Sequence, residues 1–85
     1  GQGKPKDAIP AYREAIRLDP NRPKYHLDLG VELRKQGDVD EAIACYEKAI
    51  KLDPDDYKAH LNLGTAHFSR KDYAKAEACF RRAVE

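Results

Sequence analysis

The strongest constraint on the fold of this chain is a repeat with a period of 34 residues. Pro20 and Pro54 lie 34 positions apart, and so do Gly30 and Gly64. A fixed period of this length is typical of a solenoid, in which each unit buries its apolar face against the next unit. The repeat therefore predicts an extended surface for binding another molecule and does not favour a site of chemistry.

The repeat extends over nearly all of the 85 residues. Residues 23–51 and 57–85 are identical at 10 of 29 aligned positions, and residues 3–22 match 37–56 at 9 of 20. We therefore interpret residues 1–85 as one small domain. It divides into the second half of a repeat (1–22), a full repeat (23–56) and a repeat truncated near its end (57–85). Apolar periodicity of 3–4 residues predicts helices near 5–18, 23–36, 39–52, 57–70 and 73–85.

The repeated positions resemble the tetratricopeptide repeat, with about two and a half copies. The pattern is Leu-Gly, then Ala, an aromatic residue, Ala and Pro at fixed places. Its matches are Leu29-Gly30, Ala42, Tyr46, Ala49 and Pro54, then Leu63-Gly64, Ala76, Phe80 and Ala83, and Ala8, Tyr12, Ala15 and Pro20 in the first half repeat. The resemblance implies an all-α fold in which antiparallel helical hairpins stack as a right-handed α-solenoid.

Local signals mark the helix ends. Asp38 is a suitable N-cap with Glu41 as its capping-box partner, and Asp72 occupies the equivalent position one repeat later. Gly37 allows a sharp turn between two helices. Pro10 conflicts with the helix around it, so that helix either begins near Pro10 or bends there.

His26 and His60 stand where the family often has Trp, which indicates a packing role. His60 and His67 are seven residues apart, about 10 Å along a helix, which is too far for one metal ion. No nucleophile–base pair, phosphate loop or metal motif is readable. We therefore expect no enzymatic activity, no metal and no cofactor.

Charge and cysteines limit the partners and the compartment. The net charge of +1 favours neither nucleic acid nor a membrane surface, and we find no membrane-spanning or targeting segment. The cations Arg70, Lys71, Lys75, Arg81 and Arg82 are interpreted as a solvated helix face. Equivalent positions on stacked helices lie roughly 8–10 Å apart, too far for a disulfide between Cys45 and Cys79. Free cysteines suit a soluble protein of the reducing cytoplasm.

The resemblance also implies a binding groove along the first helix of each repeat, where a peptide or a helix would lie. Leu27, Val31, Leu61 and Phe68 are interpreted as exposed apolar contacts in this groove, rimmed by cations. The complete predicted set is Lys24, Leu27, Asp28, Val31, Arg34, Lys58, Leu61, Asn62, Thr65 and Phe68, bordered by Lys35 and Ser69. The Lys, Asn and Arg clamp with which some relatives hold a chaperone carboxylate is not matched, and Asp28 would repel that group.

Sequence reasoning thus favours a non-catalytic scaffold for protein–protein interaction. Two alternatives remain open. One is a substrate-recruiting segment of a larger enzyme such as a glycosyltransferase, because some such enzymes carry arrays of this kind. The other is a self-association module, in which the uncapped last helix, with Phe80, Ala83 and Val84, forms a weak homodimer.

Overall fold

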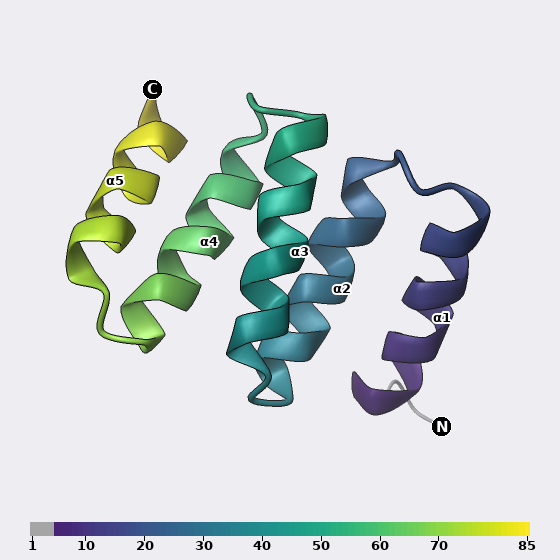
Figure 1. Cartoon of the computed structure of the whole chain (residues 1–85). Coiled ribbons are helices and arrows are strands. Elements are labelled where there is room, and N and C mark those ends of the chain that lie inside the picture. The colour runs from purple at the N-terminus through teal and green to yellow at the C-terminus, as the bar shows by residue number, and fades with distance from the viewer. Residues whose placement is uncertain (1–4) are drawn as a thin grey trace.

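The computed structural model describes the backbone of residues 5–85 and the side chains of residues 8–85. In this part of the chain the elements are five α-helices: α1 (Pro5–Leu18), α2 (Pro23–Lys35), α3 (Val39–Leu52), α4 (Tyr57–Ser69) and α5 (Tyr73–Val84). The helices stand in a row, each packed on the next, with α2 also in contact with α4 (Figure 1). The predicted all-α solenoid of helical hairpins is confirmed. The start of the half repeat assigned to 1–22 lies outside the described residues.

The predicted capping box at Asp38 is wrong, and the predicted cap at Asp72 is confirmed in position but not in its hydrogen bond. Asp38 does accept a hydrogen bond from the Glu41 amide at 3.4 Å, but the Glu41 carboxylate pairs with Arg13 at 3.0 Å instead of closing a capping box. Asp72 stands at the N-cap of α5 without a side-chain hydrogen bond. A cap that the sequence analysis missed is Asp56, which accepts from the Lys58 amide at 3.0 Å and so satisfies a free donor at the start of α4.

The helix α1 runs continuously from Pro5 to Leu18 with Pro10 inside it. The alternative in which this helix begins near Pro10 is therefore wrong. Pro10 has no amide hydrogen, so the carbonyl four residues earlier lacks its usual donor. The packing of α1 on α2 stabilises the helix despite this local cost.

The core lies where α2, α3 and α4 meet. Its largest side chain is Tyr46, which is completely buried in a cluster with Leu29, Leu33, Ala49 and Leu63. The aromatic residue one repeat later, Phe80, is only half-buried, because no helix of the described chain covers the outer face of α5. Each inner helix is therefore covered from both sides, and α5 from one side only.

His26 and His60 are buried and make the same contact in successive repeats. The Nε2–H of His26 donates to the Pro20 carbonyl, and that of His60 donates to the Pro54 carbonyl, both at 2.7 Å. Each histidine thus ties its helix to the loop that precedes it and satisfies a carbonyl that would otherwise lose a hydrogen bond on burial.

Candidate peptide-binding groove

A pocket of about 400 Å³ lies between the N-terminal parts of α2 and α4. Four of the predicted groove residues line it together: Lys24, Leu27, Asp28 and Lys58. The structure also brings in residues that the sequence analysis missed, namely Arg22, Pro23, Asp53 and Asp56. Two features of the sequence could have indicated them: Asp53 belongs to the acidic loop before α4, and Asp56 stands at the N-cap position of that helix.

The charges of this pocket are balanced. Arg22, Lys24 and Lys58 are its cations, and three aspartates are its anions. The Lys24 ammonium lies 3.7 Å from the Asp28 carboxylate, one turn along the same helix, so the two partly neutralise each other. Within the described chain the Lys58 ammonium has no carboxylate within 4.0 Å. Lys58 is therefore the cation most readily available to a ligand.

The exposure expected for Leu27 is wrong. Leu27 is only 8% exposed and belongs to the core cluster, whereas Leu61, at the same position one repeat later, is 46% exposed. The difference arises because α4 lies against α2, while no described helix lies beyond α4 in the same way. Val31 is likewise half-buried and packs against the core. Leu27 remains part of the pocket wall, but Leu61 is the aliphatic side chain that a ligand can cover.

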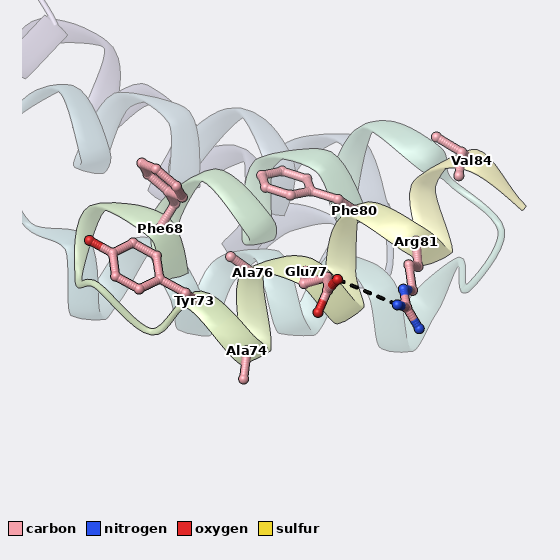
Figure 2. Close-up of a pocket in the computed structure, with 8 residues that line it drawn as sticks. All are labelled: Phe68, Tyr73, Ala74, Ala76, Glu77, Phe80, Arg81 and Val84. Atoms are coloured by element: carbon pink, nitrogen blue, oxygen red, sulfur yellow. Dashed lines mark hydrogen bonds and ion pairs between the residues drawn. The ribbon is translucent and has the colours of Figure 1, made fainter.

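The structure also separates Phe68 from the other predicted groove residues. Its ring meets the ring of Tyr73 edge to face, with centroids 5.2 Å apart. Both rings line a second cavity of about 670 Å³ on the outer face of α5 (Figure 2). The predicted site residues therefore lie on two surfaces, a groove over α2 and α4 and the end of the helix row.

The other predicted residues lie along α2 and α4 and line neither cavity. Asn62 is half-buried, and the Thr65 hydroxyl donates to the Leu61 carbonyl at 3.0 Å. Arg34 is half-buried beside Tyr46. Burial raises the pKa of the Tyr46 hydroxyl, and the neighbouring guanidinium of Arg34 partly opposes this rise. Of these residues, Asn62 keeps its amide free of any hydrogen bond within the described chain.

Among the described residues, no three histidine, cysteine, aspartate or glutamate side chains come close enough together to hold a metal ion. Cys45 and Cys79 are both free, as predicted. No helix from residue 5 onward combines the length and the apolar character needed to cross a membrane.

The stacked hairpins and the groove between their first helices define a helical repeat protein. Two overlapping segments, residues 1–31 and 27–85, match the Tetratricopeptide repeat family, so the match covers the whole chain. The chain belongs to the tetratricopeptide repeat family, as the residue pattern indicated. No curated protein sequence matches it.

Solved structures agree with this assignment. The crystal structure of MamA is similar with a TM-score of 0.92 and 28% identity, over 96% of this chain and 48% of that one. A second MamA structure, "MamA MSR-1 C2", is similar with a TM-score of 0.89 and 25% identity, over 94% of this chain and 46% of that one. The second TPR of Spaghetti (RPAP3), bound to the HSP90 peptide SRMEEVD, is similar with a TM-score of 0.93 and 25% identity, over 98% of this chain and 77% of that one. The chain spans about half the length of the two MamA chains.

Proposed function

We propose that this chain is a non-catalytic scaffold that binds a peptide segment of another protein along the groove over α2 and α4. The observation that carries the proposal is the combination of an exposed Leu61 with the pocket that Lys58 and Leu27 share. Leu61 offers apolar area, and Lys58 offers an unpaired charge. Together they provide both an anchor and an orientation for a ligand.

The charge balance of the pocket favours a peptide of mixed charge. A ligand carboxylate would pair with Lys58, and a ligand cation would meet Asp53 or Asp56, which line the same pocket. An aliphatic ligand side chain would cover Leu61. Asn62, with a free amide, could donate to the peptide backbone and accept from it regardless of the ligand sequence.

A structural relative binds the acidic HSP90 peptide SRMEEVD. For this chain we expect only weak binding of that peptide, with a dissociation constant above roughly 1 mM. If α4 were the middle helix of a carboxylate clamp, Leu27 and Val31 would replace the Lys and Asn that it needs. If α4 were the third helix, Asn62 would replace the cation and Asp28 would replace Asn, and Asp28 would repel the carboxylate. Titration calorimetry with SRMEEVD measures this, and a micromolar constant would show that a clamp has been overlooked.

The proposal is tested by selecting peptides from a displayed random library on the wild-type chain. Binding of the selected peptides is then compared with a Lys58→Glu, Leu61→Glu double variant and with Lys48→Glu, an exposed change on α3. Circular dichroism must show equal helicity for all three chains. We expect the double variant to lose at least about tenfold in affinity and the control to lose nothing. Equal affinity for all three, or failure to select any peptide, contradicts the proposed function.

A further inference from the structure

The outer face of α5 is an apolar surface that no part of the described chain covers. Tyr73, Glu77, Phe80 and Val84 form a stripe along it, with spacings of four, three and four residues (Figure 2). Val84 is 86% exposed and Tyr73 is 56% exposed. Such spacing forms one continuous seam on a helix and is the pattern through which helices pair.

The corresponding faces of α1 and α3 are covered inside the molecule. Ile9 and Ile43 stand one repeat apart on these faces, and both are partly buried and pack against the core. In α5 the same position is Glu77, which forms an ion pair with Arg81 at 3.4 Å. The outer face of α5 therefore continues an internal interface of the solenoid, but with two charges at its centre.

We propose that a second copy of this chain covers the face, with the two α5 helices antiparallel about a twofold axis between residues 78 and 79. This axis brings Tyr73 of each copy against Val84 of the other, and Glu77 of each copy against Phe80 of the other. A twofold interface requires self-complementarity. The Tyr73–Val84 contacts supply it as apolar pairs, and the charges of Glu77 and Arg81 supply it as ion pairs across the axis. Arg81 of each copy then also lies near Glu77 of the other.

The two charges favour a second copy over a foreign helix of the α4 type. The buried apolar stripe of α4, which covers α3, consists of Ala59, Leu63 and Ala66, and it contains no lysine or arginine. A helix of that kind would cover the Glu77–Arg81 pair without offering it a charged partner. Removing both charges from water would then cost free energy that no new ion pair offsets. A second copy instead completes a network of two carboxylates and two guanidinium groups. This interface is separate from the groove and does not rest on the proposed function.

Sedimentation equilibrium of the chain at low salt tests the proposal. Because one helix pair forms a small interface, we expect the dimer to become populated between roughly 10 µM and 1 mM. Glu77→Arg alone and Arg81→Glu alone each place like charges across the axis, so each variant should be monomeric where the wild type dimerises. An equimolar mixture of the two variants should dimerise again, because one copy then supplies only cations and the other only anions.

Two further variants exclude a loss of folding as the cause. Val84→Glu changes a largely exposed side chain and should weaken dimerisation at least about tenfold with unchanged helicity. Lys48→Glu, on the exposed face of α3, should leave the strength of dimerisation unchanged. The proposal is overturned if the wild type stays monomeric up to about 1 mM, which would leave the face to a foreign helix. It is also overturned if the mixture of variants fails to dimerise, or if the charge variants dimerise as the wild type does.

Discussion

Gly30 and Gly64 determine how closely neighbouring helices approach. A Cβ atom at Gly30 would lie 2.5 Å from a ring carbon of Tyr46, and one at Gly64 would lie 2.6 Å from a ring carbon of Phe80. Both contacts are too short to exist without movement. The two rings differ in their freedom, because Tyr46 is completely buried and Phe80 is half-buried.

We predict that Gly30→Ala lowers the free energy of unfolding by about 1–3 kcal/mol, because the Tyr46 ring has no space to move into. This loss should appear although alanine is favoured over glycine in a helix interior by about 1 kcal/mol. Gly64→Ala should lower the free energy of unfolding by less, since the half-buried Phe80 ring can turn towards solvent. Urea denaturation of both variants measures the difference, and an equal or larger loss for Gly64→Ala would contradict the packing described.

Cys45 gives a pH dependence at the residue scale. Burial raises the pKa of its thiol to about 11, from an ordinary value of 9.0. The folded state therefore favours the neutral thiol. The stability that this contributes is complete below the unfolded-state pKa and is lost as the pH rises through the range from about 9 to about 11.

We accordingly expect Cys45→Ala to flatten the fall in stability over this range relative to the wild type. Urea denaturation at several pH values between 8 and about 11 measures it. Taking the difference between the two chains removes the contributions of lysine and tyrosine residues, which titrate in the same range in both. A wild-type curve parallel to that of the variant would show that the thiol titrates normally in the folded state.

At the scale of the element, the two hairpin turns place different residues in the same left-handed backbone conformation. The turn from α2 to α3 contains Gly37 with φ 88°, and the turn from α4 to α5 contains Lys71 with φ 67° at the equivalent position. A residue with a side chain is strained in this left-handed region, whereas glycine is not. The second hairpin therefore forms at a local cost that the first avoids.

Lys71→Gly should stabilise the fold by roughly 0.5–1 kcal/mol, because relief of the strain exceeds the added flexibility of the unfolded chain. The matched change Gly37→Lys should destabilise it by a similar amount. Thermal denaturation of the two variants measures both effects. Destabilisation by Lys71→Gly would indicate that the Lys71 side chain has a role of its own.

At the scale of the whole molecule, the sequence was sufficient for the arrangement of helices but not for the exposure of individual residues. The period of 34 residues and the Gly and aromatic positions predicted five helices whose ends fall within one residue of those observed. Leu27 and Leu61 occupy the same repeat position and differ in exposure only because α4 covers one of them. Phe68 does not lie in the predicted groove, because its ring contacts the ring of Tyr73 across the turn between α4 and α5. The first contact depends on a neighbouring repeat and the second on how two side chains meet across a turn, and the pattern of repeat positions encodes neither.

The most direct test of the proposed groove is a nuclear magnetic resonance titration of the labelled chain with a peptide selected on it. We predict that amide shifts change along α2 and α4, centred on Lys58 and Leu61, and that the outer face of α5 is unaffected. The same titration of the Lys58→Glu, Leu61→Glu variant should show no shifts at these positions. Shifts centred on α5, or on the exposed face of α3, would contradict the account and move the binding site to another surface.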